Sequence, residues 1–409
     1  TTGNDIPTVV NDNIYYDRTN MGVTNTQGLR DFHNRFVKRK LITSVSKRGD
    51  TLIDMSVGMG GDLQKWIDAK LSFVFGLDYS KDNIHNRIRG VCSRYLNSKK
   101  KYRVMPGGLF IQGDSSLNIK NGDACFTEKG KQIVNALNGI GPKDETVLGK
   151  GVYKRYGVAK HGFNIVSNQF SIHYFFKNRN TFYNFIQNLN ENCKIGGYVI
   201  GTCYDGSKVF RLLEQKQPGE SAFIMNENDT KMWDVKKLYN QTSFADDDTS
   251  LGYAVDVYQE SINKTFTEYL VNFDFLIRVM ENYGFVPIND NEAQRFGFPS
   301  GIGSFERLFD IMEDDIEQKR LKRSDIGKAI NMTQNEKTIS FLNNYFIFKK
   351  VRNPNAVELT NQVLTISQQQ EELNKEDTEE VKSNLNKINK TKVNKRKVKK
   401  FKKKLKLPK

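Results

Sequence analysis

Small residues between a strand and a helix are the first feature of this sequence with a chemical use. Thr51–Met55 is a short apolar run with a β-branched centre, which is the pattern of a buried strand. Asp62 opens an amphipathic helix shortly afterwards. The turn between them is built from small residues: Ser56, Gly58, Gly60 and Gly61. In an open α/β sheet such a turn lets bare backbone come close to a nucleotide-like ligand.

A carboxylate follows at a characteristic distance from this turn. The next apolar run, Phe73–Leu77, ends on Asp78, about twenty residues after Gly58. An acidic residue at that spacing can accept hydrogen bonds from both hydroxyls of a ribose. A complete G-x-G-x-x-G pattern is missing, which argues against a dinucleotide and against a nicotinamide-dependent oxidoreductase. The combination favours a smaller nucleoside ligand such as S-adenosylmethionine.

Alternating strands and helices must position these residues. Asp114 and Ser115 follow a third strand, so they are expected at the ligand-binding edge of the sheet. The other expected elements are helices from Leu29 and over 81–97, 180–190 and 273–283, and strands over 109–112, 163–167, 198–202, 253–260, 266–271 and 341–350. A polar segment is expected over 215–250. This pattern predicts a doubly wound α/β domain with an antiparallel C-terminal edge.

Composition limits the class of protein. The 409 residues carry a net charge of +16, and 381–409 alone holds 14 Lys and Arg with no acid. Residues 1–355 still carry +8, which suits a polyanionic partner. No apolar run is long enough for a membrane span, and no signal-peptide pattern is present, so no membrane partner is expected. The four cysteines lack metal spacing and are interpreted as reduced thiols of an intracellular protein.

Three regions fall outside the regular pattern. Residues 1–28 are interpreted as an N-terminal arm or linker, and 353–409 as a disordered, Lys-rich C-terminal tail. Residues 116–160 are interpreted as an insertion, with a mobile surface loop favoured over a contact surface for single-stranded nucleic acid. The chain begins Thr-Thr-Gly without Met, and we expect a fragment of a longer polypeptide.

Three spaced motifs carry a family resemblance. Asn168–Phe176, within SNQFSIHYFF, resembles the Q-F-x-x-H-Y signature of messenger-RNA cap guanine-N7 methyltransferases. It follows D-x-x-x-G-x-G-G-D-L-x-K-W at Asp54–Trp66 and N-x-x-x-K at Asn34 and Lys38. The resemblance extends over 29–352 and is strongest to the methyltransferase domain of mRNA-capping enzymes from large DNA viruses. It implies a mostly parallel, seven-stranded, Rossmann-like sheet of the S-adenosylmethionine-dependent methyltransferase type.

The resemblance implies S-adenosylmethionine as cofactor and assigns its contacts. Lys38 would meet the methionine carboxylate, and Asp78 would hold the ribose. The turn at Ser56 and Gly58 would let the backbone approach the cofactor. Asp114 and Ser115 would hold the edge of its adenine, and Gln169 and Tyr174 would line its reactive end.

A second site for the cap is implied beside the first. His173 and Glu268 would read the guanine, with Tyr345 closing the pocket. The ribose and phosphates of the cap would face Asn34, Arg35, Lys65 and Arg94. No general acid or base is expected, because guanine N7 already has a free lone pair; His173, Tyr174 and Glu268 would act by positioning.

Two departures from the family pattern stand in the turn. Ser56 replaces its first glycine and keeps the turn if its φ is negative. Met59 replaces a basic residue and removes one phosphate partner. Two other functions stay open: a methyltransferase acting on another RNA or a small molecule, and a non-catalytic capping-complex subunit that retains the fold.

The resemblance also implies partners and a location. The 5′ end of capped mRNA (GpppRNA) would be the substrate. A guanylyltransferase/triphosphatase domain in the same longer polypeptide, or a stimulatory subunit, would be the partner; no K-x-D-G nucleophile motif is present in this chain. The expected location is intracellular: the host cytoplasm, including viral factories, the nucleus, or packaging in the virion.

Overall fold

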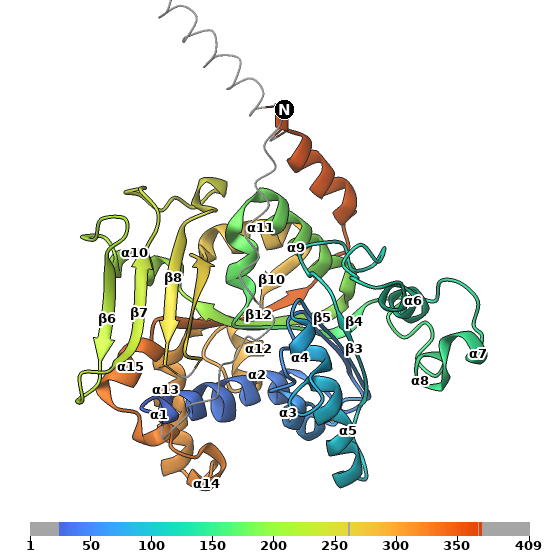
Figure 1. Ribbon diagram of the computed structural model, residues 1–409, viewed down its shortest axis with the longest axis horizontal. Coiled ribbons are helices and arrows are strands. Elements are labelled where there is room, and N and C mark those ends of the chain that lie inside the picture. Colours follow the sequence, from blue (N-terminus) through green and yellow to red (C-terminus); the bar gives the residue numbers. More distant parts are fainter. Residues whose placement is uncertain (1–23, 261, 367, 370–409) are drawn as a thin grey trace, which may run out of the picture. The chain divides into compact units, whose positions relative to one another are not determined.

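The computed structural model describes residues 24–260, 262–366 and 368–369 (Figure 1). The chain divides into two compact units, and the fold below is that of the first, which ends at Ala356. Most of the proposed N-terminal arm and Lys-rich tail, 1–23 and 370–409, lies outside the described residues. The arm ends earlier than residue 28, because Thr26 is buried and the first helix begins at Gln27.

A mostly parallel sheet forms the centre of this unit. Its strand order is β10-β12-β5-β4-β1-β2-β3, and the short β11 also pairs with β12. The strands are β1 (Thr51–Asp54), β2 (Phe73–Asp78), β3 (Gly107–Gln112), β4 (Phe163–Gln169), β5 (Cys193–Tyr204), β10 (Phe285–Pro287), β11 (Ile302–Ser304) and β12 (Asn343–Lys350). β12 runs antiparallel to β5, so the predicted antiparallel edge is confirmed. The continuous order contains seven strands, which is the number expected, and β11 adds an eighth. β10 was not predicted as a strand from the sequence.

The strand order creates a binding crevice at one edge of the sheet. β1 lies between β2 and β4 and is parallel to both. The chain order reverses there, so the carboxyl ends of β1 and β4 flank a switch point where ligands of doubly wound sheets bind. The ends of these strands and of β2 carry Asp54, Gln169 and Asp78, which therefore share one edge.

The helix expected from Leu29 is confirmed, although its middle is wider than an α-helix. It consists of α1 (Gln27–Asp31), a π-helical segment (Phe32–Val37) and α2 (Lys38–Val45). Phe32, Val37 and Leu41 are buried along one side, as the apolar spacing predicted. Wider turns of this kind are frequent at functional sites, and this one lies directly before Lys38.

Two expected elements differ in the structure. The helix predicted over 81–97 is broken into α4 (Lys81–His85) and α5 (Val91–Lys101). The break spans 86–90: Asn86 already leaves the helical conformation, and Gly90 packs so closely that a Cβ atom there would lie 2.6 Å from the backbone nitrogen of Asn86. The insertion is not a loop but contains α6 (Glu128–Leu137), α7 (Glu145–Leu148) and α8 (Lys150–Tyr153), packed around Ala136, Leu148 and Val152.

A second sheet is antiparallel and has four strands, β6-β7-β8-β9 (yellow in Figure 1). Its strands are β6 (Ser221–Met225), β7 (Lys231–Lys237), β8 (Ala254–Gln259) and β9 (Lys264–Tyr269). β8 and β9 match the strands predicted there. β6 and β7 lie in the polar segment 215–250, where the sequence did not predict a strand. Trp233 and Val235 are buried in β7, while polar residues alternate with them and lower the mean hydropathy.

The remaining helices cover the sheets. They are α9 (Arg179–Asn192), α10 (Gly206–Leu212), α11 (Phe273–Asn282), α12 (Asp290–Arg295), α13 (Phe305–Glu317), α14 (Arg323–Ile326) and α15 (Gln334–Ser340). α9 and α11 lie on the opposite side of the central sheet from α2 and α13 (Figure 1). In the part of the chain that is described, no helix is long and apolar enough to cross a membrane.

The N-terminal helix is held by a buried carboxylate from the C-terminal part of the fold. One oxygen of Glu336 accepts a hydrogen bond from the backbone N–H of Leu29 at 3.0 Å, and the other from that of Thr333 at 2.8 Å. The second bond belongs to the capping box of α15. Asp31 likewise accepts from the backbone N–H of Lys328 at 2.9 Å. The C-terminal region thereby fixes the segment that carries Lys38.

We expect Glu336→Ala to lower the free energy of unfolding by about 2–4 kcal/mol. The change removes a cap, which is worth about 1 kcal/mol, and leaves a buried N–H unpaired at about 1–3 kcal/mol. Glu336→Gln keeps one acceptor oxygen and should have about half the effect. Urea denaturation followed by circular dichroism measures both. Glu317→Ala, a change at an exposed residue, is the control. Equal stability of the two alanine variants would contradict the role of Glu336 in holding the N-terminal helix.

Candidate functional site

The turn after β1 has the backbone that its small residues predict. Gly58 has a φ of +54° and Gly60 of +71°, which is the left-handed region. Ser56 is not among the residues with positive φ, so the condition for keeping the turn is met. A Cβ at Gly60 would lie 2.7 Å from the side chain of Val91, whereas one at Gly58 would meet nothing within 4 Å. Open space therefore remains beside Gly58.

Asp78 is aimed at this turn. Its Oδ2 accepts a hydrogen bond from the backbone N–H of Gly58 at 2.7 Å. Its Oδ1 accepts from the backbone N–H of Ser80 at 2.9 Å and from the side chain of Asn83 at 2.8 Å. Burial raises the pKa of Asp78 above its ordinary value, and these three donors act against that rise. The structure thus brings Asp78 and Gly58 together, as the sequence predicted.

A buried carboxylate, Asp62, holds two of the expected site lysines. The Nζ atoms of Lys38 and Lys65 each lie 2.9 Å from Asp62 Oδ1. Burial alone would raise the pKa of Asp62, but the two lysines lower it to about 2. Lys65 also donates to the carbonyl of Gly61 at 3.0 Å and is buried. This placement disagrees with the expectation that Lys65 faces phosphates of a cap.

Asp54 was quoted in the motif but was not expected as a site residue. It is buried at the end of β1 and accepts from the backbone N–H of Ser56 at 3.2 Å. Burial, followed by the negative charge of Asp62, raises the pKa of Asp54 to about 7. The sequence signal that could have identified Asp54 is an acidic residue at the end of an apolar strand, shortly before a glycine turn. Together Asp54, Asp62 and Asp78 surround the turn with carboxylates.

The segment after β3 reaches the same edge. Ser115 is buried and donates its hydroxyl to the carbonyl of Met55 at 2.6 Å, which joins the ends of β3 and β1. Asp114 Oδ1 accepts from the backbone N–H of Ser116 at 2.8 Å. Asn188 of α9 also holds the loop, donating to the carbonyl of Ser115 at 2.9 Å. Asp114 and Ser115 are therefore at the expected edge, with the Ser115 hydroxyl bonded inside the protein.

The Q-F-x-x-H-Y segment begins at the end of β4. Gln169 Oε1 accepts from the hydroxyl of Thr202 at 3.1 Å. Phe170 has a φ of +54°, a conformation held by its N–H, which donates to the Thr202 carbonyl at 2.9 Å. A 3-10 helix (Ile172–Lys177) follows and carries His173 and Tyr174, whose ring centroids are 4.2 Å apart.

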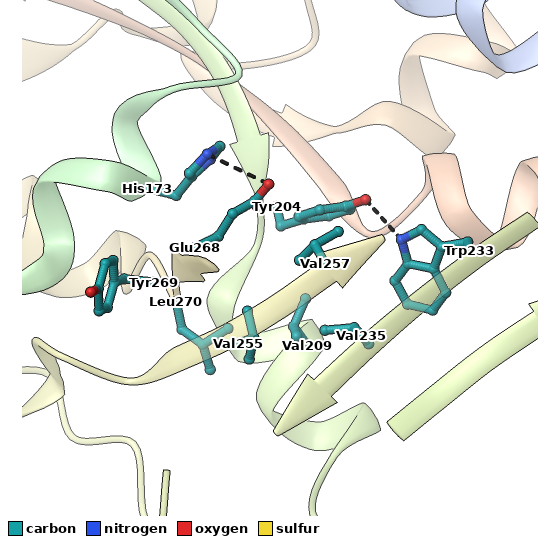
Figure 2. A pocket seen from close by; sticks show the side chains of 10 residues that line it. All are labelled: His173, Tyr204, Val209, Trp233, Val235, Val255, Val257, Glu268, Tyr269 and Leu270. Atoms are coloured by element: carbon teal, nitrogen blue, oxygen red, sulfur yellow. Dashed lines mark hydrogen bonds and ion pairs between the residues drawn. The ribbon is translucent and has the colours of Figure 1, made fainter. Parts of the chain in front are cut away.

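His173 and Glu268 meet at one end of an apolar pocket between η2, the 3-10 helix just described, and the second sheet (Figure 2). His173 Nε2 lies 3.6 Å from Glu268 Oε1, which is too long for a hydrogen bond. Neither ring nitrogen of His173 has a hydrogen-bond partner among the described residues. Burial lowers the pKa of His173 to about 3 and raises that of Glu268 to about 8. At neutral pH both members of this pair are therefore mainly uncharged.

The rest of the pocket is made by residues that the sequence did not single out. Trp233 Nε1 donates to the hydroxyl of Tyr204 at 3.0 Å, which fixes both rings (Figure 2). The other lining residues are Val209, Val235, Val255, Val257, Tyr269 and Leu270. Most of these residues come from β5, α10 and β7–β9, and no local spacing in the sequence reports contacts over such separations.

Tyr345 is not brought into this pocket. Its side chain is fully buried, its ring lies 5.0 Å from that of Phe298, and its hydroxyl donates to the carbonyl of Ser300 at 3.0 Å. The structure therefore places it inside the core beside β11 and not among the residues that line the His173–Glu268 pocket.

The remaining polar residues expected at the cap lie on two helices. Asn34 donates to the carbonyl of Arg30 at 2.9 Å, and Arg35 forms an ion pair with Asp31 at 3.1 Å; both side chains reach solvent. Arg94 donates from Nη1 to the carbonyl of Met59 at 2.7 Å. Arg94 is thus held at the glycine turn from α5. Among the described groups, no cluster of His, Cys, Asp and Glu could hold a metal ion.

Comparison with known proteins agrees with the motifs. The family model of the mRNA (guanine-N(7))-methyltransferase domain matches residues 6–351. The chain is 26% identical over 362 residues to the "Probable mRNA-capping enzyme" of Acanthamoeba polyphaga mimivirus, covering 84% of this chain and 29% of that protein. It is 25% identical over 332 residues to the mRNA cap guanine-N(7) methyltransferase of Saccharomyces cerevisiae, covering 79% and 64%.

A third relative is the mRNA-capping enzyme of African swine fever virus, 25% identical over 275 residues, with 67% of this chain and 27% of that protein covered. The chain thus spans less than a third of these two viral relatives. The family match covers far more than half of the chain, and the expected resemblance is confirmed. The chain belongs to the mRNA (guanine-N(7))-methyltransferase domain family.

Proposed function

We propose that this chain transfers the methyl group of S-adenosylmethionine to N7 of the guanine at the 5′ cap of mRNA, converting GpppN to m7GpppN. The observation that carries the proposal is the His173–Glu268 pair. Both ring nitrogens of His173 are buried without a hydrogen-bond partner within the described structure, and the contact with Glu268 is too long to be one. A buried polar group left unpaired costs about 1–3 kcal/mol, so a ligand that pairs with it gains that energy.

The residues around the glycine turn fit the cofactor. S-adenosylmethionine carries a sulfonium and an ammonium, which a carboxylate at the turn such as Asp78 attracts. Lys38, which Asp62 holds in place, would bind the carboxylate of the cofactor. Asp78 already accepts three hydrogen bonds, which leaves part of its acceptor capacity for a ribose hydroxyl. When bound, the cofactor supplies an activated methyl group.

The pocket residues fit guanine. The N1–H and the 2-amino group of guanine are two donors on one edge, and a carboxylate with two oxygens is their natural acceptor. Glu268 presents such a carboxyl at the wall of an apolar pocket. Gln169 and His173 belong to one short segment, so a guanine held by Glu268 would lie close to the cofactor edge.

Positioning is then the whole of the protein's chemical task. Guanine N7 attacks with its own lone pair, so no side chain has to remove a proton. Orientation alone provides effective molarities of about 10⁵–10⁸ M. The methylated base is a cation, and the carboxylate of Glu268 and the ring of Tyr174 would stabilise that charge as it develops.

We further propose that the chain acts beside RNA-triphosphatase and guanylyltransferase activities, in the same polypeptide or through a stimulatory subunit, in an intracellular compartment. Support comes from the two viral relatives, which are named mRNA-capping enzymes and extend well beyond the matched region.

Transfer of labelled methyl from S-adenosylmethionine to GpppRNA tests the main proposal. Nuclease digestion should recover the label on N7 of the cap guanine. Label on another base or on a small molecule would contradict cap methylation and identify a different methyl acceptor. Cofactor binding without any transfer, even with added capping subunits, would indicate a non-catalytic subunit.

We expect Asp78→Ala to raise the Kd for S-adenosylhomocysteine by about 10- to 150-fold, which corresponds to the loss of about 1.5–3 kcal/mol of charge-assisted hydrogen bonding. The KM for GpppRNA should change much less at saturating cofactor. Isothermal titration calorimetry measures the first quantity and initial rates the second. Asp310→Ala, an exposed change on α13, serves as the control. An unchanged cofactor Kd would remove Asp78 from the cofactor site.

We expect Glu268→Ala to abolish methylation while leaving the Kd for S-adenosylhomocysteine nearly unchanged, because the carboxyl contacts guanine and not the cofactor. If the variant lost both functions together, the assignment of two separate sites would be wrong. Circular dichroism would show that the variant is folded.

Cap affinity should also depend on pH. The pKa of Glu268 is raised to about 8, and guanine needs its carboxylate form. Cap affinity should therefore increase by about tenfold per pH unit as pH rises toward 8, and level off above it. His173 stays neutral across this range because its pKa is lowered to about 3. Titration of GpppG measures the effect; Glu268→Gln should bind weakly with no such slope, and a flat wild-type profile would contradict the assignment.

A further inference from the structure

One stretch of the surface, 81–104, is strongly cationic, with a net charge of +7. Residues 81–103 hold eight Lys and Arg and one acid, Asp82, whereas the whole of 1–355 carries +8. All eight cationic residues are exposed: Lys81, Arg87, Arg89, Arg94, Lys99, Lys100, Lys101 and Arg103. The seven other than Arg94 form no ion pair with a described residue.

The loop between α4 and α5 presents two of these cations in a fixed conformation. Asn86 Oδ1 accepts from the backbone N–H groups of Ile88 at 3.0 Å and of Arg89 at 2.9 Å. The hydroxyl of Ser93 donates to the carbonyl of Arg87 at 2.7 Å. Arg87 and Arg89 therefore project from an ordered loop and not from a frayed helix end.

This surface starts at the cofactor turn. Arg94 binds the carbonyl of Met59, and Val91 packs against Gly60. From there α5 extends for 11 residues, or about 16 Å, to Lys101 (Figure 1). A nucleic-acid strand that runs from the turn along α5 would thus pass the arginines first and the lysines afterwards.

Stability does not account for the charges. Lysines in the last turn of α5 do interact favourably with the helix dipole. Arg89, however, directly precedes Gly90, the N-cap of α5, where a cation opposes the dipole. Arg103 lies beyond the helix. Uncompensated like charges in one stretch repel one another, which costs folding energy unless a polyanion binds.

Exposed apolar side chains are interspersed with these cations. Ile88 is 81% exposed and Val104 80%, with Leu96 and Tyr102 also exposed between them. Proteins that bind single-stranded nucleic acid combine a cationic track for the backbone with apolar or aromatic faces for the bases. A duplex, whose bases are stacked inside, offers no such contact to Ile88 and Val104.

The α6–α8 insertion is a weaker candidate for the same partner. In the sequence Lys143 is followed directly by Asp144 and Glu145, and the guanidinium of Arg155 packs over the ring of Phe73 at 5.2 Å. Lys143 lies over the rings of Tyr153 and Tyr156, which occupies these aromatic faces.

We propose that the 81–104 surface binds the single-stranded RNA immediately downstream of the cap. This inference rests on the proposed cap methylation, since it takes the bound cap as the start of the strand. It adds a second determinant of substrate choice: a capped oligonucleotide binds through cap and strand, whereas a cap dinucleotide binds through the cap alone.

Two multiple variants test the surface: Arg87→Ala/Arg89→Ala, and Lys99→Ala/Lys100→Ala/Lys101→Ala. Each should raise the KM for a capped single-stranded oligonucleotide by about tenfold and leave the KM for GpppA within about twofold. The dependence of log KM on log salt concentration should become shallower by about one for each phosphate group that the variant no longer binds. Lys150→Ala/Lys154→Ala, which changes exposed cations at the two ends of α8, is the matched control and should behave as wild type.

Binding of an uncapped single-stranded oligonucleotide, followed by fluorescence anisotropy, separates this inference from the proposed function. Weaker binding by both 81–104 variants supports the surface even if the wild-type protein transfers no methyl group. Wild-type affinity in both variants overturns it, and so does an equal rise in the KM for GpppA. Weaker binding by the α8 control alone would also overturn it, because the RNA would then bind the insertion.

Discussion

The buried carboxylate of Asp62 is the group on which the rest of the site depends. It binds Lys38 from α2 and Lys65 from α3, and so joins the N-terminal helix to the glycine turn. Burying three charges is expensive, and removing one partner of a buried pair typically costs about 3–5 kcal/mol because the other charge is left uncompensated. The N-terminal helix is in turn held by Glu336, so the geometry at Lys38 depends on residues close to both ends of the described fold.

The two sites use opposite electrostatic designs. At the turn, Asp62 is kept ionised by its two lysine partners, as its low pKa shows. In the pocket, His173 and Glu268 are kept neutral by apolar neighbours such as Val255 and Val257. This difference fits the two ligands proposed. The cofactor carries an ammonium, a carboxylate and a sulfonium, so it needs fixed charges around it. A neutral guanine instead needs a carboxyl, here that of Glu268, which ionises when the N1–H and 2-amino donors of the base approach it.

Sequence patterns predicted what depends on local order. Apolar runs located β1, β2 and β4, and the acids ending two of them fell at one edge of the sheet because parallel strands share their carboxyl ends. The predictions that failed concern features that local spacing does not report. β7 was hidden because its buried residues alternate with polar ones, and the position of Lys65 was not foreseen because spacing does not report which charge a lysine meets. Tyr204 and Trp233, from different sheets, pair over a separation that no motif encodes.

The methionine at position 59 shows how a departure from a family motif is resolved in three dimensions. Met59 is buried, so its side chain packs into the fold and presents no charge to a ligand. Its carbonyl nevertheless accepts a hydrogen bond from Arg94 of α5, which brings a guanidinium to the same turn. The positive charge that the motif would place within the turn is thus supplied from a neighbouring helix. Because α5 is part of the longer cationic surface 81–104, charge next to the cofactor turn and charge along the proposed RNA path belong to one continuous stretch of the chain.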